Sequence, residues 1–326
     1  MTVTIKNISQ VAGVSYSTVS KALNDSPLVK PETKAKIVKI AKEMGYQPNL
    51  AAQQLVSKQS KVIGLIWPTL ERVLPSVLVT KLNEEISKHS YSMILSISPI
   101  KTSIEMFKRF QVDGVIVFDE KDHSMLESID LPVVTYGVGK NKSLPVIDVN
   151  YQEAMQTAVE YLYQLGHKKI AYMGEFPPID DRQLEKYYGF QNAMQKFQLP
   201  IHNSHLINTG GLDWYDGFTA TKRLLSSGEM PTAIIGSSYD ISAGIVRALR
   251  EANIIIPKDI SVISYDNISQ MTNMEILITC VGVPVEQIAH HIVETLLSII
   301  KNKQTIPHIK PLTPTITERT SCAPAK

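Results

Sequence analysis

The chain has no long apolar run and few of the features on which membrane and secreted proteins depend. Among its 326 residues, no apolar stretch approaches the roughly 18 residues that a membrane-spanning helix requires. The opening Met-Thr-Val-Thr-Ile-Lys lacks the apolar segment of a signal peptide, so we expect a cytoplasmic protein that makes no membrane contact. Its two cysteines, Cys280 and Cys322, do not have metal-site spacing. A disulfide between them could form, but a chain with this much apolar core does not need one, which fits a reducing compartment.

The chain also lacks the arrangements that are typical of enzyme active sites. Gly137-Val-Gly-Lys140 does not have the Gly-x4-Gly-Lys-Ser/Thr spacing of a phosphate loop, and there is no Gly-x-Ser-x-Gly nucleophile motif. His202 and His205 have no acids or cysteines nearby at metal-site spacing, and the same holds for His290 and His291. We therefore expect solvated or capping histidines, no metal, no cofactor and no enzymatic activity.

Charge is distributed unevenly along the chain. Residues 1–60 contain eight Lys, no Arg and three acids, a net charge of +5. The whole chain carries +2, which leaves −3 for residues 61–326. A basic segment on a mildly acidic body favours binding to nucleic-acid phosphates. The alternative is that these lysines only solvate a small helical bundle.

The basic segment has the pattern of a small DNA-binding domain. Apolar residues recur at three-and-four spacing within Ile5–Ala12 and again within Ser15–Asn24, on either side of the turn Gly13-Val14. Two short helices joined by a tight turn form a helix-turn-helix, whose second helix enters the DNA major groove. A third helix is expected over Pro31–Met44 and should end at Gly45.

Capping residues mark where these helices begin. Ser15 is expected to be the N-cap of the second helix, because its hydroxyl can accept a hydrogen bond from an amide of the first turn. Glu32 suits the first turn of the third helix, where a carboxylate faces the positive end of the helix dipole. Leu50–Leu55 is another short helix-capable segment, and the polar linker Val56–Ser60 follows it.

The rest of the chain alternates between strand-like and helix-like segments. Strands are expected at Val62–Trp67, Tyr91–Ile97, Gly114–Phe118, Pro132–Tyr136, Lys169–Met173, Ala233–Ile235 and Ser261–Ser264. Helices are expected at Leu78–His89, Ala154–Leu165, Tyr188–Phe197 and Ile241–Ala252. Repeated βα units predict an α/β fold of parallel sheets covered by helices. Two such sheets in tandem leave a ligand cleft between two lobes, at the carboxyl ends of the strands.

Short segments of distinctive sequence occur in a fixed order along nearly the whole chain. They are Thr4-Ile-Lys, Ala12-Gly-Val-Ser-Tyr-Ser-Thr-Val-Ser20, Tyr46-Gln-Pro-Asn49, Ala51-Ala-Gln-Gln-Leu55, Val112-Asp-Gly-Val-Ile116, Leu165-Gly-His-Lys-Lys-Ile-Ala171, Asp259-Ile-Ser-Val-Ile-Ser-Tyr-Asp266 and Glu318-Arg-Thr-Ser321. In this order and spacing they resemble the lactose/purine repressor family of bacterial transcription regulators. The resemblance implies an all-α helix-turn-helix headpiece followed by a two-lobed, periplasmic-binding-protein-like core of parallel sheets.

The resemblance also implies a domain organisation. Residues 1–46 would form the helix-turn-helix domain, and 47–60 the hinge helix and linker. Core lobe one would comprise 61–148 and 282–312, and core lobe two 149–281 and 313–326, with the effector cleft between the lobes. The chain would cross between the lobes near Asp148–Tyr151, Cys280–Val283 and Leu312–Pro314.

For DNA, the resemblance implies base contacts by Tyr16, Ser17 and Lys21 at the start of the second helix. Lys21 can donate to guanine, but it lacks the planar fork of arginine. Leu55 of the hinge segment would wedge a base step open in the minor groove, at the centre of a palindromic operator. Phosphate contacts are expected from Ser15, Thr18, Asn24 and Thr33, and further DNA contacts from Thr4, Ile5, Asn49 and Ala52.

For the effector, the resemblance implies five candidate positions. Asp148 and Asp266 stand where the family keeps ligand-binding acids, and Trp214 lies near the usual place of an aromatic platform for a sugar. Lys186 replaces the arginine that the family commonly has there, and Ser238 begins a Ser-Tyr pair in place of the usual Asn-Asp. We therefore expect a small polar ligand, a sugar or sugar derivative, whose identity these departures leave open.

The sequence thus predicts a dimeric, ligand-responsive transcriptional regulator that binds a palindromic operator in double-stranded DNA. A repressor of genes for sugar uptake or catabolism is favoured. The sequence also allows an activator, and it does not show whether the effector releases or promotes DNA binding. The alternative class is a solute-binding protein or sugar-processing enzyme with a basic N-terminus, but neither an export signal nor a catalytic set is present. No leucine heptads lie in Ser321–Lys326, which favours a dimer over a tetramer.

Overall fold

The computed structural model describes residues 3–46, 59–118, 124–138, 144–176, 181–302 and 310–326. The chain forms two compact units, residues 1–60 and residues 61–326. The described part of the first unit contains the helices α1 (Ile5–Ala12), α2 (Tyr16–Leu23) and α3 (Pro31–Glu43). Ile8, Val19 and Ile37 contribute one fully buried side chain from each helix to a small common core. The predicted helix-turn-helix and third helix are therefore confirmed.

The helices of the first unit begin and end at capping residues. Thr4 and Asn7 form a reciprocal capping box at the start of α1. Gly13 ends α1 with φ of 69°, a left-handed conformation that glycine adopts without the steric penalty of a side chain. The Ser15 hydroxyl accepts a hydrogen bond from the Thr18 amide at 3.2 Å, which confirms Ser15 as the N-cap of α2.

The second unit begins with a five-stranded sheet in which all pairings are parallel. Its strands are β1 (Val62–Ile66), β2 (Ser92–Ser96), β3 (Gly114–Phe118), β4 (Val133–Tyr136) and β5 (Val146–Ile147), in the order β2-β1-β3-β4-β5. Its helices include α5 (Val73–Lys88), α6 (Ile100–Phe110) and α7 (Ser124–Glu127). All five residues of β3 are buried, as expected for a strand with both faces covered.

A six-stranded sheet forms the core of the other lobe. Its strands are β6 (Ile170–Gly174), β7 (Leu206–Asn208), β8 (Ala233–Gly236), β9 (Ser261–Asn267), β10 (Thr279–Pro284) and β11 (Thr315–Thr317), in the order β11-β10-β9-β8-β6-β7. Only the β10–β11 pairing is antiparallel. Its helices are α8 (Tyr151–Gln164), α9 (Asp181–Lys196), α10 (Trp214–Ser227) and α11 (Tyr239–Glu251), with 3-10 turns η1 (Asn203–His205) and η2 (Ser269–Asn273). The predicted α/β fold of parallel sheets is thereby confirmed.

Each predicted strand has a counterpart, but all four predicted helices begin earlier than predicted, and α5 and α9 show the largest differences. α5 begins at Val73 rather than Leu78, because Pro75 lies in its first turn, where the missing N–H needs no partner. α9 begins at Asp181 rather than Tyr188. The sequence pattern did not indicate β5, β7, β10, β11, α6, α7 or α10, and α12 (Val285–Asn302) is the helix on which His290 and His291 lie.

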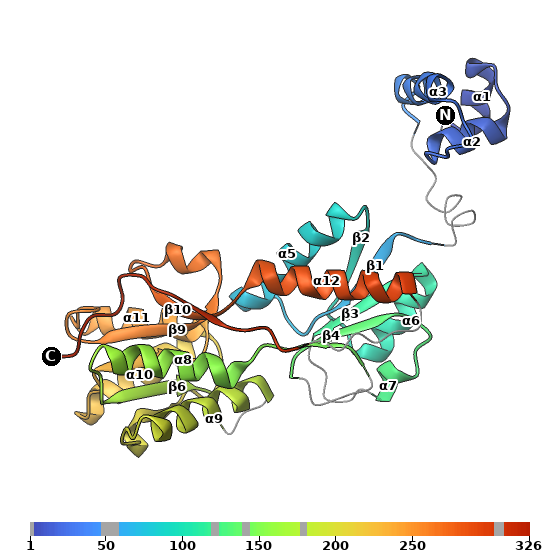
Figure 1. The fold of residues 1–326 in the computed structure, drawn as a ribbon. Coiled ribbons are helices and arrows are strands. Elements are labelled where there is room, and N and C mark those ends of the chain that lie inside the picture. The colour runs from blue at the N-terminus through green and yellow to red at the C-terminus, as the bar shows by residue number, and fades with distance from the viewer. Residues whose placement is uncertain (1–2, 47–58, 119–123, 139–143, 177–180, 303–309) are drawn as a thin grey trace. The chain divides into compact units, whose positions relative to one another are not determined.

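The chain passes between the two sheets in segments that lie side by side. Val149 forms a parallel bridge with Leu312. The Leu312 amide donates to the Asp148 carbonyl at 2.8 Å, and the Asn150 amide donates to the Leu312 carbonyl at 3.2 Å. β10 leads directly into α12, which packs against α5 of the first lobe (Figure 1). No helix in the described ranges is long and apolar enough to cross a membrane.

Where α5 meets α12, histidines have acidic partners that lie far from them in the sequence. His290 Nδ1 lies 2.9 Å from Glu85 Oε1, and His89 Nε2 lies 3.1 Å from Glu294 Oε1. The hydrogen bond from His290, together with that from Lys88, lowers the pKa of Glu85. The fold thus brings Glu85 to the exposed His290 across a helix–helix contact, a pairing that spacing in the sequence does not indicate.

Helices α10 and α11 approach so closely that their backbones touch through glycine. A Cβ atom built on Gly244 of α11 would lie 2.1 Å from the Trp214 carbonyl oxygen and 2.5 Å from the Phe218 nitrogen. On the facing helix, a Cβ atom on Gly217 would lie 2.4 Å from the Ile241 carbonyl oxygen. All three obstructing atoms belong to the backbone, so a side chain at either glycine would push the helices apart.

We therefore expect Gly244→Ala to destabilise the second unit, although glycine-to-alanine changes in helices ordinarily stabilise them. The cost should be about 1–3 kcal/mol, the range typical of overpacking. Urea denaturation followed by tryptophan fluorescence measures it, since both tryptophans, Trp67 and Trp214, belong to this unit. Ser226→Ala, at an exposed position of α10, is the control and should unfold like wild type. Unchanged or increased stability of Gly244→Ala would contradict the packing described.

Candidate DNA-binding surface and effector cavity

One face of α2 packs against the first unit's core and the opposite face is exposed. Val19 and Ala22 are buried, whereas Tyr16, Ser17 and Lys21 are exposed. The three side chains predicted to read bases therefore share the surface of one short helix. Of the other predicted contacts, Thr4, Ser15 and Asn24 are exposed, and Ile5, Thr18 and Thr33 are partly buried. Asn49, Ala52 and Leu55 lie outside the described residues.

Several predicted phosphate contacts also hold the headpiece together. The Ser15 hydroxyl lies 2.9 Å from the Ser17 hydroxyl and 2.8 Å from that of Thr18, in addition to capping α2. Thr4 is committed in part to its capping box with Asn7. The Thr4 and Ser15 hydroxyls therefore position the starts of α1 and α2, and any contact with DNA would be a second role.

Ser15→Ala should weaken α2 locally, because the first turn loses the hydroxyl that accepts its amide hydrogen bond. We expect a loss of about 1 kcal/mol, typical for removal of an N-cap. Amide hydrogen exchange of α2 in the full chain, read by mass spectrometry, reports this local stability. Ser17→Ala removes a neighbouring hydroxyl but no cap and should exchange almost as wild type does. Equal protection of α2 in Ser15→Ala and wild type would show that the cap does not stabilise the helix.

In the second unit, a cavity lies between the two lobes, at the carboxyl ends of the parallel strands. Phe118 and Tyr136 are the last residues of β3 and β4, and Asp266 is close to the end of β9. The described residues that line it are Arg72, Leu74, Pro75, Phe118, Tyr136, Tyr151, Arg182, Gln183, Lys186, Tyr265 and Asp266. Two of the five predicted effector residues, Lys186 and Asp266, are thus brought together here.

Asp266 is held in an unusual backbone conformation. Its φ of 86° lies in the left-handed region, which a residue with a side chain occupies at a cost of about 1–3 kcal/mol. Its Oδ2 accepts a hydrogen bond from the Tyr239 amide at 2.8 Å, at the N-terminus of α11, where the helix dipole favours a carboxylate. Oδ1 has no hydrogen-bond partner among the described residues. The carboxylate is therefore fixed in place, with one oxygen available for a ligand.

Two cations of α9 belong to the same cavity. The Lys186 side chain is buried, and its Nζ donates to the Ser237 carbonyl at 2.8 Å and lies 3.9 Å from the centre of the Tyr265 ring. Arg182 lies one helical turn earlier, with its guanidinium 4.2 Å from the centre of the Phe118 ring. Arg182, four residues before Lys186, therefore supplies the planar guanidinium group that a lysine side chain lacks. Arg182 was not predicted, because the helix was expected to begin only at Tyr188.

Aromatic rings form most of the remaining wall. Phe118 makes edge contacts with Trp67 and Tyr136, with ring centres 4.5 Å and 5.5 Å apart. Burial raises the pKa of Tyr136 to about 12, and it raises the pKa values of Tyr151 and Tyr265 well above their ordinary value. All three tyrosines therefore keep their protons at neutral pH and can donate hydrogen bonds.

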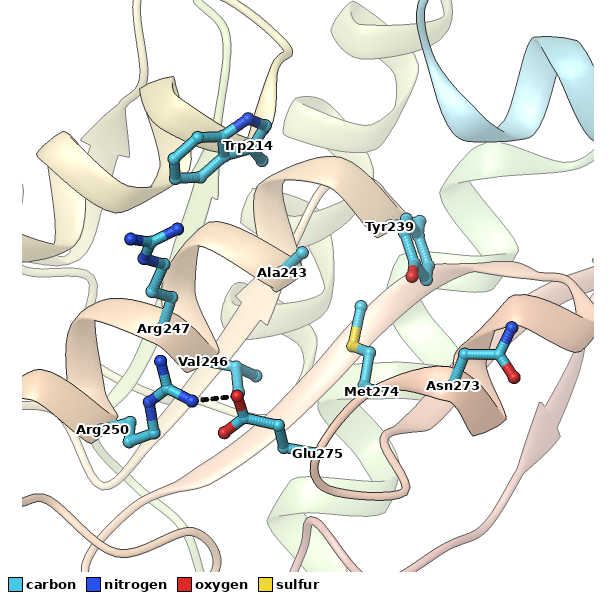
Figure 2. Close-up of a pocket in the computed structure, with 9 residues that line it drawn as sticks. All are labelled: Trp214, Tyr239, Ala243, Val246, Arg247, Arg250, Asn273, Met274 and Glu275. Atoms are coloured by element: carbon cyan, nitrogen blue, oxygen red, sulfur yellow. Dashed lines mark hydrogen bonds and ion pairs between the residues drawn. The ribbon is translucent and has the colours of Figure 1, made fainter.

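The other predicted effector residues lie elsewhere. Ser238 is the N-cap of α11: its buried hydroxyl accepts from the Ile241 amide at 3.3 Å. Asp148 does not line the cavity, although its charge contributes to the raised pKa of Tyr136. Trp214 starts α10 and lines a separate groove of lobe two, where the Arg247 guanidinium lies 5.0 Å from its ring (Figure 2).

Trp214 also lines a second hollow, which lies between the two lobes. Arg72 Nε lies 3.8 Å from Asp240 Oδ2, and the Val73 amide donates to the same oxygen at 3.4 Å. Arg72, Asp240 and Trp214 line this hollow together with Thr69, Glu71, Leu212 and Asp213. Burial raises the pKa of Asp240 to about 6, against the opposing effect of Arg72.

The raised pKa of Asp240 predicts a pH-dependent stability. Because the folded protein holds this proton more tightly than the unfolded chain does, its stabilising contribution is full below about pH 4 and is lost as pH rises through about 6. The shift corresponds to roughly 3 kcal/mol. Asp240→Asn should flatten this fall between pH 4 and 7 in urea denaturation, whereas Asp130→Asn, at an exposed carboxylate, should keep it. An equal pH slope in wild type and Asp240→Asn would refute the assignment.

A small helical unit that exposes a reading helix, joined to a two-lobed core with a polar cavity, defines a ligand-responsive DNA-binding regulator. Residues 4–49 match the model of the bacterial regulatory proteins of the lacI family, and residues 159–322 match a periplasmic binding protein-like domain. The probable HTH-type transcriptional repressor ExuR of Bacillus subtilis (strain 168) is 31% identical over 93% of this chain and 93% of its own. Catabolite control protein A of Priestia megaterium is 28% identical over 94% of this chain and 95% of its own.

Solved structures agree in fold. The lac repressor dimer bound to operator and the anti-inducer ONPF superposes with a TM-score of 0.83 at 24% identity, covering 99% of this chain and 100% of that one. The complex of the transcriptional regulator CelR with cellobiose gives a TM-score of 0.70 at 22% identity, covering 98% and 99%. The chain belongs to the lacI family of bacterial regulatory proteins. It is a DNA-binding transcriptional regulator and not an enzyme.

Proposed function

We propose that this protein is a cytoplasmic, dimeric repressor of sugar uptake or catabolism genes. It binds a palindromic operator through its first unit and responds to a small molecule bound between the lobes of its second. The observation that carries the effector part is the cavity itself: a preorganised Asp266, the buried Lys186 and aromatic walls meet where two lobes can move against each other.

The named relatives support both parts of this proposal. The relative in Bacillus subtilis is named a repressor, and the lac repressor was solved as a dimer on its operator. Regulators with the same fold were solved with cellobiose and, for the one from Enterococcus faecium, with bound ribose. Carboxylates accept hydroxyl hydrogen bonds and aromatic faces cover the apolar side of a sugar ring, and this cavity contains both kinds of group.

Ligand binding would act through the angle between the lobes. Arg72, Phe118 and Tyr136 come from one side of the cavity, and Lys186 and Asp266 from the other. A ligand that contacts both sides favours one relative position of the lobes, in proportion to its differential affinity for the two states. In a dimer, this change would alter the spacing of two hinge segments, each with Leu55, and so the population bound to the operator.

Lys21→Ala should reduce base preference at one position of each operator half-site. We expect a loss of about 1–3 kcal/mol of discrimination there, the range for a specific side chain–base contact. Binding titrations against operators carrying single base changes measure it, after the operator has been selected from a random DNA library with the wild-type protein. Lys39→Ala changes the same charge on α3 and should lower affinity evenly, without altering preference. Unchanged preference in Lys21→Ala would exclude Lys21 as a base reader.

The function itself is tested by the same selection and by one variant. Wild type should enrich a palindrome, and an effector sugar should shift its affinity for that palindrome. Asp266→Ala should bind the palindrome as wild type does but no longer respond, because the fixed carboxylate is gone. Failure to enrich any palindromic DNA would overturn the proposed function, and a normal ligand response in Asp266→Ala would place the effector elsewhere.

A further inference from the structure

Helices α5 and α12 meet along a line of polar side chains. Three pairs cross from one helix to the other: Lys81 with Glu286, Glu85 with His290, and His89 with Glu294. On each helix the members are four residues apart, so they leave one face of that helix at successive turns. The numbers rise together along both helices, so the helices run in the same direction here. None of these six side chains lines the cavity between the lobes.

Histidine takes the place of a permanent cation in two of these pairs. Lys81 faces Glu286 as a full positive charge, with its Nζ 3.8 Å from Oε1. An imidazole is a weaker ion-pair partner because it is charged only when protonated, but its neutral ring offers a nitrogen lone pair to a metal ion. The two histidine pairs therefore combine nitrogen and oxygen ligands, which the lysine pair does not.

Three of these side chains lie close enough together to share one metal ion. Ligand atoms of Glu85, His89 and Glu294 all lie within 4.8 Å of one another, and the described ranges contain no other such group of histidine, cysteine or acidic residues. Two ligands at about 2.0–2.2 Å from a tetrahedral zinc ion are roughly 3.4 Å apart. His89 Nε2 and Glu294 Oε1, at 3.1 Å, already have about this separation. Binding therefore requires only a side-chain adjustment of about 1–2 Å.

Glu85 is held in position by its neighbours. Its side chain is only 12% exposed, and its Oε1 lies 2.9 Å from His290 Nδ1. An ionised carboxylate has about four lone pairs on its two oxygens, so Glu85 can keep this hydrogen bond while it binds a metal ion. Its Oε2 pairs with Lys88, whose side chain is 67% exposed. The Lys88 ammonium can therefore turn into solvent when a divalent ion takes its place.

The helices that carry these side chains are well packed. Leu82 and Ile86 of α5 and Ala289 and Val293 of α12 are buried, and the two helices contact each other. A site that is built on packed helices keeps its geometry better than one that is built on loops. The ligand positions are therefore fixed by the fold before any ion arrives.

We propose that Glu85, His89 and Glu294 form a binding site for a divalent transition-metal ion, of which zinc fits best, and that His290 positions Glu85. One nitrogen and two oxygen ligands suit zinc, which often takes three protein ligands and one water. Magnesium and calcium prefer oxygen ligands alone, so the imidazole of His89 selects against them. The two carboxylates balance the charge of the ion.

A bound ion would join two helices that come from distant parts of the chain. Because it binds the folded chain and not the unfolded one, it should stabilise the lobe that contains α5 and α12. Spacing in the sequence did not indicate this site, since its ligands come together only when α12 packs on α5. The site goes beyond the proposed function and does not depend on it.

The test uses the full chain without an affinity tag and zinc chloride alone as the probe. Isothermal titration calorimetry should show binding of zinc in the micromolar range, and zinc should raise the temperature at which the chain unfolds. His89→Gln and Glu294→Gln should each weaken zinc binding by roughly tenfold or more, because each removes a ligand. Both side chains are partly exposed, so we expect both variants to fold, and circular dichroism checks this.

Two variants serve as matched controls. Glu286→Gln removes an exposed carboxylate from the same face of α12, and His202→Gln removes an exposed histidine from the other lobe. Both should bind zinc as wild type does. Magnesium in large excess should not displace the zinc, because it has little affinity for imidazole.

Three results would overturn this inference: no zinc binding in the micromolar range, unchanged affinity in His89→Gln, or equal loss of affinity in Glu286→Gln and Glu294→Gln. The first would leave the two histidine pairs as hydrogen bonds between helices. The second would show that zinc does not need the imidazole of His89. The third would show that zinc responds only to the negative charge along α12.

Discussion

The hydrogen bond between the Tyr239 amide and the Asp266 carboxylate fixes the geometry of the cavity between the lobes. It joins the end of β9 to the start of α11 and holds Asp266 at a φ of 86°. The strain of this conformation is tolerable because Asp266 is buried and the N-terminus of α11 compensates its charge. A carboxylate held in this way undergoes little reorganisation when a ligand arrives, so more of the binding energy remains for moving the lobes.

The same helix start also connects the two lobes. Asp240, the residue after Tyr239, accepts the Val73 amide and faces Arg72 of the first lobe. At the N-terminus of α11, Tyr239 therefore binds the Asp266 carboxylate, and the next residue, Asp240, contacts the other lobe. The close α10–α11 packing through Gly217 and Gly244 makes this end part of a rigid pair of helices. A ligand held by Asp266 would therefore lie beside a contact that joins the two lobes.

How far the sequence could predict these features depended on the kind of signal. Runs of β-branched residues, such as Gly114–Phe118, identified the buried strands, and capping residues such as Ser15 located the headpiece helices. Lys186 and Asp266 were found through family resemblance. Arg182 was missed although it precedes Lys186 by one turn, because polar residues hide the first half of α9. The position of Trp214 depended on which way α10 faces, and that is set by packing against α11 rather than by local pattern.

The late position of α12 in the chain has a consequence for biosynthesis. This helix covers α5 of the first lobe, yet its buried Ile288, Ile292 and Leu296 follow the β6–β10 strands of the second lobe in the sequence. Domains ordinarily fold as their residues emerge from the ribosome. The strands of the first sheet are therefore synthesised well before α12, and the apolar face that α12 covers stays exposed until then. By this measure, the first lobe is not an autonomous folding unit. A chain interrupted before Val285 would expose that face permanently and become a substrate for aggregation or degradation.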